Sequence, residues 1–498
     1  MFGPPSRSQA GIQPTRMFSS IRTLDISIVL IGLIFAWRFF RRTRRTAPFP
    51  PGPRGLPLIG NPSRHAVSRK NGLPSLNGGK NMATSHQFQF LIRKALFTRI
   101  GHLSRWAGEL VGWKHSLGLM PYGARLRNQR RLAHQLLGNN AAIKQFLPMV
   151  ELETHRFLKR ISDKPDELPA YIRKTAGAII LQISHGYTIQ EENDPFVKLA
   201  EKNMDQFSLS MTPGSFLVNL IPTLRHVPEW LPGAGFKRTA REWASTLSDF
   251  VERPHTYVKQ QMAAGNARPS FTSSQLEGGV SAEDESDIKW LAGSLYAGGA
   301  DTTVSSIYAF FKAMVLYPEV QAKAQAEIDA VIRERLPYVN ALVLEVTRWH
   351  SVGPTGIAHC ASEDDVQFGY FIPKGTVILA NIWKMLHDPT VYNEPFKFNP
   401  DRFIRTDNKE SELDPYKIAF GFGRRICPGK VLADASIFIS CAMVLAVFDI
   451  SKYSENGIVF EPDTDHTAGT ISHPSPFKCT IKARSRKALE LIDEEIIA

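Results

Sequence analysis

A chain of 498 residues with 43% hydrophobic and 10% aromatic side chains can bury a large core, which excludes a disordered protein and a small disulfide-stapled one. The net charge of +13 is compatible with nucleic acid, an anionic membrane surface or an acidic protein partner. No zinc-finger or basic-zipper spacing occurs, so we expect no nucleic-acid binding. No CxxC pair occurs among the cysteines, which excludes a disulfide framework and a cysteine-rich zinc site; these are Cys360, Cys427, Cys441 and Cys479.

The first predicted element is an apolar segment at residues 24–40, after a tail at residues 1–23. Its first fourteen residues would rise only about 21 Å as a helix, but Phe39 and Phe40 extend the apolar face and Arg38 can snorkel. No small-residue cleavage site follows, which favours a retained single-pass membrane anchor over a cleaved signal peptide or an interfacial helix. Five arginines follow the apolar run and three precede it, so the main domain should face the cytosol.

Prolines dominate the next segment, residues 46–61, which contains PFPPGPRGLPLIGN. They prevent helix continuation and form a stiff hinge between the anchor and the rest. No long Ser- or Gly-rich linker divides residues 62–498, which we therefore expect to form one large domain. Residues 61–87 are polar and rich in Gly, Asn and Ser, which predicts a loop or disordered segment and not a paired strand, and no strand pattern occurs between Asn61 and Trp113.

Helical periodicity prevails in the large domain. Residues 134–258 are mostly helical by pattern, apart from a proline-containing turn region at 222–232. Residues 286–317 lack proline and predict one helix of about 50 Å, after which helices restart at Pro318 and near Pro337. In the last of these, i, i+3, i+4, i+7 spacing predicts a buried face of Val339, Leu342, Val343 and Val346. Residues 366–379 predict two short strands around a turn at 373–375, so the fold class is mainly α with a small β portion.

The most informative stretch is FGFGRRICPG, residues 420–429, which has the pattern FxxGxRxCxG. Gly423 and Gly429 would let the backbone approach a flat group closely and adopt conformations closed to other residues. The apolar residues after Lys430 predict a helix start, whose dipole favours a charged thiolate at Cys427. The alternative is a glycine-rich loop with an incidental cysteine, but five fixed positions in ten residues argue against it.

With these residues the sequence resembles the cytochrome P450 family, and most closely its fungal, microsomal class II members, from the proline hinge to the carboxyl end. The resemblance implies the P450 fold and a haem b whose iron is bound by the Cys427 thiolate. It implies that Phe420 shields the sulfur from water and that Arg425 clamps a haem propionate through its planar fork.

A second motif, AGGADTT at residues 297–303, lies in the long predicted helix. Gly298 and Gly299 each cost about 1 kcal/mol relative to Ala inside a helix, which points to a required kink. In the family this local widening admits dioxygen and water, the hydroxyl matching Thr302 organises protons for oxygen activation, and the acid matching Asp301 relays them from solvent. A helix interface of small residues with a capping Asp is the structural alternative.

The remaining matches are individually weaker. Glu345 and Arg348 are adjacent on one helix face and match the family's ExxR motif, and Arg402 in PFKFNPDRF would complete a buried, structural Glu-Arg-Arg network. Further propionate contacts are implied for Arg130 and His359, although the family usually has Trp where this chain has Leu126. Residues 352–357 and 469–472 would contact the substrate, and their apolar character implies a hydrophobic one.

Three functions follow as hypotheses. The first is a monooxygenase of the endoplasmic reticulum membrane that takes electrons from NADPH through a reductase, inserts one atom of dioxygen into a lipophilic substrate, and uses its basic surface to bind that acidic partner. The second is a haem-binding but impaired relative, because the expected strands between residues 61 and 113 and a loop after Val331 are missing from the pattern. The third, haem-thiolate isomerase or dehydratase chemistry, is disfavoured by the retention of Asp301 and Thr302.

Overall fold

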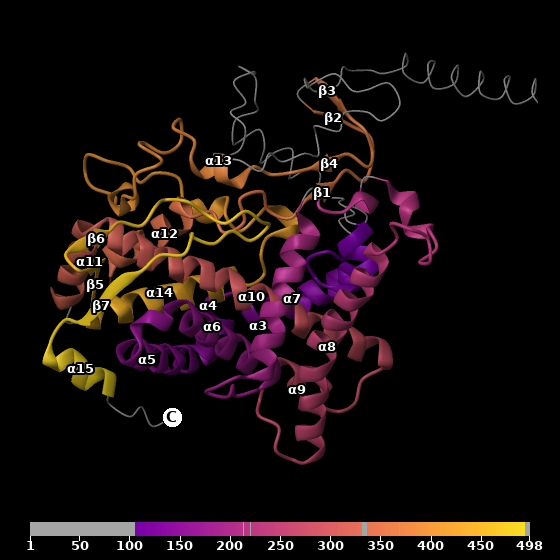
Figure 1. Cartoon of the computed structure of the whole chain (residues 1–498), viewed down its shortest axis with the longest axis horizontal. Coiled ribbons are helices and arrows are strands. Elements are labelled where there is room, and N and C mark those ends of the chain that lie inside the picture. Colours follow the sequence, from indigo (N-terminus) through magenta and orange to yellow (C-terminus); the bar gives the residue numbers. More distant parts are fainter. Residues whose placement is uncertain (1–104, 213, 220, 331–335, 368, 494–498) are drawn as a thin grey trace, which may run out of the picture. The chain divides into compact units, whose positions relative to one another are not determined.

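The computed structural model describes residues 105–493 except 213, 220, 331–335 and 368 (Figure 1). The predicted tail, anchor and hinge, and the predicted loop or disordered segment at residues 61–87, lie outside the described residues. Residues 364–374 belong to one compact unit, and all other described residues belong to a second. The described chain is mainly helical with short strands, so the predicted fold class is confirmed.

The helices of the second unit follow one another from residue 124 to residue 493. They are α3 (Ala124–Leu137), α4 (Asn140–Ile143), α5 (Leu147–Asp163), α6 (Leu168–His185), α7 (Pro195–Met211), α8 (Phe236–Ala263), α9 (Phe271–Leu276), α10 (Ala282–Leu316), α11 (Pro318–Ala330), α12 (Pro337–Trp349), α13 (Ile382–Leu386), α14 (Lys430–Val447) and α15 (Arg486–Asp493). The predicted long helix is α10, and its restarts at Pro318 and Pro337 are confirmed, as is the break at residues 222–232 between α7 and α8.

Helices α10 and α12 contribute many residues to the hydrophobic core. Ser281 caps α10 by accepting a hydrogen bond from the Asp284 N–H, and acidic residues fill the positive first turn. The helix then packs against α6, α8, α12 and α14. The predicted buried face of α12 is confirmed, because Val339, Leu342, Val343 and Val346 are at most 2% exposed.

α14 is the one described helix that is long and apolar enough to cross a membrane. It is instead a core helix, since Cys441, Val444 and Leu445 are fully buried and the helix packs against α5, α10, α11 and α12. It lies far along the chain from the predicted anchor at residues 24–40.

The strand prediction for residues 366–379 is partly wrong. Strands do flank the predicted turn, but β3 (Tyr370–Ile372) pairs with β2 (Asp365–Gln367), and β4 (Val377–Ile378) pairs with β1 (His359–Cys360). Gly369, with φ +77°, supplies an additional turn that was overlooked. A sheet in the order β6-β5-β7 was also overlooked; its strands are β5 (Phe448–Glu455), β6 (Ile458–Phe460) and β7 (Cys479–Ala483).

Candidate active site

The loop of residues 420–429 is closed by a backbone hydrogen bond from Cys427 N–H to the Phe420 carbonyl, 2.8 Å long. Gly421 and Gly423 take positive φ values of +78° and +57°, which other residues rarely adopt, so they make the turn possible. The expectation for Gly429 is wrong, because its φ is −87°. A Cβ there would lie 4.0 Å from Cys427 Sγ, an ordinary contact distance, so space does not require a glycine at this position either.

Cys427 lies three residues before Lys430, where α14 begins. Its side chain is accessible to solvent, but protein atoms crowd it on other sides, and this desolvation raises its pKa. The Gly429 backbone and the Arg130 guanidinium act in the opposite direction and favour the thiolate. Phe420 is half-buried, and its ring packs edge-on against Tyr416 with centroids 5.0 Å apart. Shielding of the sulfur by Phe420 stays a prediction.

Arg130 and His359, two residues distant in the sequence, lie near Arg425 of this loop. Arg130 on α3 donates to the Ile426 carbonyl at 2.9 Å, and Arg425 donates to the Met120 carbonyl at 3.0 Å. Burial, followed by repulsion from Arg130, lowers the pKa of Arg425 to about 10. Burial and the charge of Arg425 lower the pKa of His359 on β1 to about 4, so His359 is neutral at pH 7. The fold therefore brings together the residues predicted to hold the propionates.

This set of donors fits haem. A thiol can ligate the iron, and two neighbouring guanidinium groups that repel each other suit the two carboxylates of one ligand. Arg130 makes no ion pair with any carboxylate among the described residues, although it is half-buried. His359 can add a neutral hydrogen bond. The individual ligand roles stay predictions.

The AGGADTT motif lies on α10, and the helix is continuous across it. The Thr302 hydroxyl donates to the Gly298 carbonyl at 2.7 Å. A Cβ on Gly299 would lie 3.0 Å from Ile180 Cγ1, so this glycine permits close packing of α6 on α10, whereas a Cβ on Gly298 would meet nothing within 4 Å. Close packing against α6 therefore explains the glycine at position 299. The kink expected from the two glycines stays a prediction.

Asp301, beside Thr302, has a partner that sequence reasoning missed. Its Oδ1 lies 3.0 Å from His473 Nε2. No local spacing connects the two residues, because His473 belongs to the segment between β6 and β7.

The Glu-Arg-Arg network is present and buried. Arg348 makes two hydrogen bonds to the Glu345 carboxylate, 2.7 and 2.9 Å long, and Arg402 lies 3.1 Å from it. Glu412 adds a carboxylate 2.7 Å from Arg402, which the sequence did not suggest. Burial lowers the pKa of Arg402, but Glu345 and Glu412 outweigh this and raise it. The network ties α12 to the segment at residues 395–403.

The two segments predicted to contact substrate adjoin each other. Ser472 N–H donates to the Val352 carbonyl at 2.8 Å, which joins residues 469–472 to residues 352–357. Ile357 is 37% exposed.

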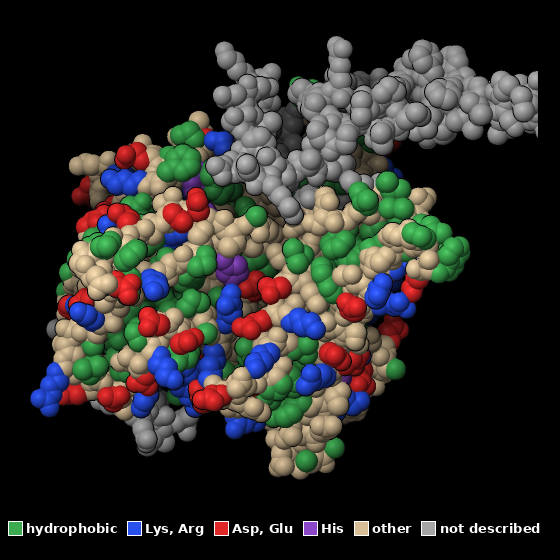
Figure 2. Space-filling view, viewed as in Figure 1, with side chains coloured by type: hydrophobic (Ala, Val, Ile, Leu, Met, Phe, Trp, Pro, Cys, Tyr) green, Lys and Arg blue, Asp and Glu red, His purple; other side chains and the backbone are tan. Residues whose placement is uncertain are grey.

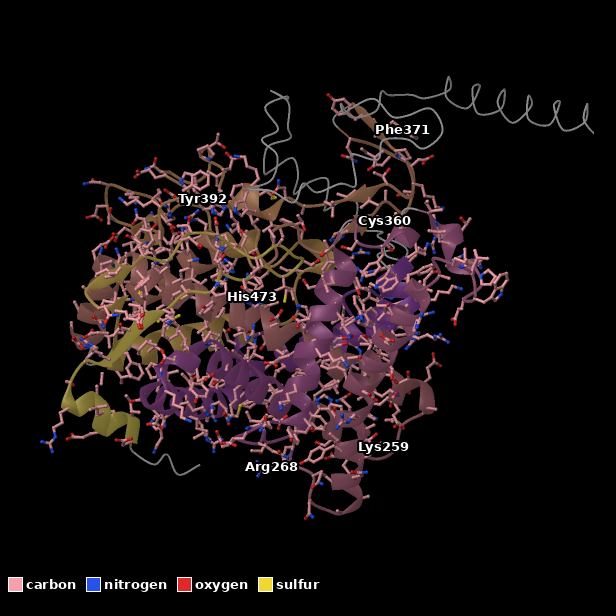
Figure 3. All side chains as sticks on the ribbon, in the orientation of Figure 1. Lys259, Arg268, Cys360, Phe371, Tyr392 and His473 are labelled. Atoms are coloured by element: carbon pink, nitrogen blue, oxygen red, sulfur yellow. The ribbon has the colours of Figure 1, made fainter. Side chains whose placement is uncertain are left out.

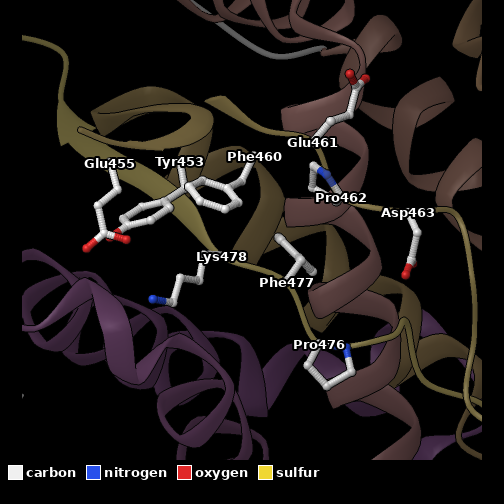
Figure 4. A pocket seen from close by; sticks show the side chains of 9 residues that line it. All are labelled: Tyr453, Glu455, Phe460, Glu461, Pro462, Asp463, Pro476, Phe477 and Lys478. Carbon is white, nitrogen blue, oxygen red and sulfur yellow. The ribbon is translucent and has the colours of Figure 1, made fainter. Parts of the chain in front are cut away.

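A separate pocket of about 310 Å³ lies among β5, β6 and the segment before β7 (Figure 4). Tyr453, Phe460 and Phe477 contribute aromatic walls, and Asp463 and Lys478 contribute charge. None of its lining residues belongs to the predicted site, so it is not the haem pocket.

A helical domain that presents a cysteine loop before a core helix, with arginines gathered at that loop, defines a haem-thiolate protein. The comparisons agree: the sequence profile of the Cytochrome P450 family matches residues 85–481. The chain belongs to the cytochrome P450 family, and it is a haem-dependent, oxygen-incorporating oxidoreductase.

Curated relatives match nearly the whole chain. Cytochrome P450 monooxygenase 208 of Postia placenta is 46% identical over 96% of this chain and 98% of its own length. Cytochrome P450 monooxygenase claR of Ampulloclitocybe clavipes is 41% identical over 97% of this chain and 95% of its own. A zebra fish cytochrome P450, in a structure with abiraterone, shares the fold with a TM-score of 0.62 and 20% identity over 81% of this chain and 93% of that one.

These matches do not favour the hypothesis of an impaired, incomplete relative. The described end of the irregular region is also well packed, because Trp106 and Trp113 are at most 4% exposed in helical turns at Arg105–Val111 and Trp113–His115. The predicted deficit after Val331 falls on residues outside the described ones.

Proposed function

We propose that this P450 monooxygenase takes electrons from NADPH through a separate flavoprotein reductase and inserts one oxygen atom into a lipophilic substrate at the endoplasmic reticulum membrane. The observation that carries the proposal is the gathering of Arg130 and His359 at the Cys427 loop, beside the loop's own Arg425. Residues from three distant parts of the chain meet there, and their chemistry suits one cofactor.

Each of these residues has a part in holding haem. Cys427 would ligate the iron, Arg130 and Arg425 would neutralise the propionates, and His359 would add a neutral hydrogen bond. Thiolate-bound haem supplies the activation of dioxygen, because the ligand's electron density favours O–O cleavage. Phe420 and the tight turn at Gly421 and Gly423 would limit access of water to the sulfur.

Asp301 and Thr302, both on α10, would relay protons from solvent to the site of oxygen activation. The Thr302 hydroxyl is anchored to the Gly298 carbonyl and remains able to accept a hydrogen bond. The neighbouring Asp301 carboxylate is part-exposed, so it can exchange protons with solvent and pass them toward the Thr302 hydroxyl. The apolar segments at residues 352–357 and 469–472 would contact the lipophilic substrate.

Membrane attachment is supported by the predicted anchor at residues 24–40 and by an apolar surface patch between α7 and α8. Figure 2 shows hydrophobic side chains gathered over this part of the molecule, at the upper right. The patch consists of Leu209, Leu217, Ile221, Trp230 and Leu231, which are 39–80% exposed. Exposed apolar patches of this kind mark interaction sites, and a bilayer surface suits one that belongs to an anchored chain.

The first experiment is a carbon-monoxide difference spectrum of the reduced protein. We expect the red-shifted Soret band of a thiolate ligand, its loss in Cys427→Ser, and its retention in the matched control Cys479→Ser, a half-buried free cysteine outside the ligand loop. A band that survives in Cys427→Ser would overturn the assignment of the ligand.

The second experiment measures product and hydrogen peroxide per NADPH with added reductase. Thr302→Ala should divert a larger share of NADPH to hydrogen peroxide, because the hydroxyl that organises proton delivery for oxygen activation is missing. The neighbouring substitution Thr303→Ala should not have this effect. An unchanged product-to-NADPH ratio in Thr302→Ala would refute the proton role of Thr302.

A further inference from the structure

Asp301 is paired across the fold with a single imidazole. The distance from its Oδ1 to His473 Nε2 is 3.0 Å, and each side chain keeps 19% of its surface exposed. His473, which is labelled in Figure 3, belongs to the second unit. The pair therefore lies at ion-pair distance and is still in contact with solvent.

His473 is held in place by its own loop, residues 466–474. Thr467 N–H donates to the His473 carbonyl at 2.7 Å, and His473 N–H donates to Thr467 Oγ1 at 2.9 Å. The preceding residue, Ser472, is bound to the Val352 carbonyl. The imidazole thus projects from a braced backbone and not from a free tail.

The same loop is fixed to α10 one turn beyond the proton motif. Ser305 on α10 donates to the Ser472 carbonyl at 2.5 Å, and His350 Nε2 lies 3.1 Å from that carbonyl and 2.7 Å from Ser305 Oγ. His466, at the start of the loop, lies with its Nδ1 3.2 Å from His350 Nδ1. Loop and helix therefore form one hydrogen-bonded assembly, which fixes the distance between His473 and Asp301.

We infer that His473 is the positioning residue for Asp301 and the source of the proton that Asp301 relays. The protonated imidazole gives its Nε2 proton to Asp301 Oδ1, which leaves a neutral imidazole and a neutral carboxylic acid, and water at the exposed edge of His473 returns a proton to Nε2. This inference rests on the roles proposed for Asp301 and Thr302. The residues that contact substrate by resemblance, 469–472, end directly before His473.

Turnover with reductase tests the proton step. His473→Ala and His473→Gln should both raise the share of NADPH lost as hydrogen peroxide several-fold, as Asp301→Asn should, because glutamine can hold Asp301 but cannot deliver a proton. The matched control is His134→Gln, an exposed histidine on α3 outside this assembly. Equal uncoupling in His134→Gln would show that the effect is not specific to His473, and wild-type coupling in His473→Gln would refute the proton step.

Melting temperatures of the resting holoenzyme test the contact without turnover. If the pair exists in solution, Asp301→Asn and His473→Ala each lower the melting temperature. The melting temperature of the double variant should then be no lower than that of the less stable of the two single variants. Strictly additive shifts would overturn the inference. If Thr302→Ala and Asp301→Asn uncouple turnover but His473→Ala does not, the inference about His473 fails and the proposed roles of Asp301 and Thr302 stand. If none of the three variants uncouples turnover, the proposed proton roles of Asp301 and Thr302 fail as well.

Discussion

The two adjacent arginines of the cysteine loop have different surroundings. Arg425 is half-buried beside Arg130, which helps to lower its pKa to about 10, whereas Arg424 is exposed and donates to the Tyr122 hydroxyl at 3.2 Å. Two partly buried cations repel each other unless anions lie between them. The haem propionates are those anions in our proposal.

Arg425→Ala should therefore reduce the haem content. Arg425→Lys should have a haem content between those of Arg425→Ala and the wild type, because an ammonium group lacks the planar fork that binds a carboxylate through two hydrogen bonds. The measurement is haem per protein by the pyridine haemochrome method, with the exposed neighbour Arg424→Ala as the matched control. Equal haem loss in the two alanine variants would contradict a specific role for Arg425.

At the scale of elements, the Glu-Arg-Arg network connects α12 to residues 395–403. Glu345 holds both Arg348 and Arg402, and all three side chains are at most 2% exposed. Glu345→Gln removes the charge shared by two buried guanidinium groups. We expect a loss of about 3 kcal/mol in the free energy of unfolding, since breaking a buried pair strands its partner charge.

Denaturant unfolding followed by fluorescence measures this loss. The control is Glu410→Gln, which removes the partner of Arg405 in a pair whose side chains are 75% and 78% exposed. Solvent screening makes such pairs weak, so its unfolding midpoint should stay at the wild-type value. Similar midpoints for Glu345→Gln and Glu410→Gln would show that the network does not stabilise the fold.

The adjacent glycines of α10 give a second prediction at this scale. Alanine favours helix over glycine by about 1 kcal/mol, and Gly298→Ala should gain part of this because its new Cβ meets open space. Gly299→Ala pushes its Cβ against Ile180, and overpacking costs about 1–3 kcal/mol. Its melting temperature should therefore lie below that of Gly298→Ala, and the reverse order would contradict the packing reason for Gly299.

The features that the sequence predicts correctly depend on local spacing. Glu345 and Arg348 meet because they are three residues apart on a helix, and prolines mark the starts of α11 and α12. The contacts of Asp301 with His473 and of Arg402 with Glu412 require knowledge of how distant segments pack. The pairing of β4 with β1 was missed for the same reason, although the alternating burial of Phe448 and Ile450 in β5 is a local signal that was overlooked.

For the whole molecule, buried histidines predict how stability depends on pH. His387 is 4% exposed and stacks on Trp383, and burial lowers its pKa from 6.5 to about 4. Burial lowers the pKa of His185 as well, to about 3. In the unfolded chain such groups take up protons near pH 6.5, while in the folded chain they stay neutral until the pH is much lower.

Between about pH 6.5 and pH 4 the unfolded state therefore binds more protons, so stability falls as the pH falls through this window. At pH 5, His387 alone accounts for a loss of about 2 kcal/mol relative to pH 7. His387→Gln removes this proton uptake and should flatten the decline in melting temperature between pH 7 and pH 5, whereas replacement of the exposed His134 by Gln should leave the decline as it is. An equally steep decline in His387→Gln would mean that other groups, and not the neutral histidine packed on Trp383, set the acid limit of the fold.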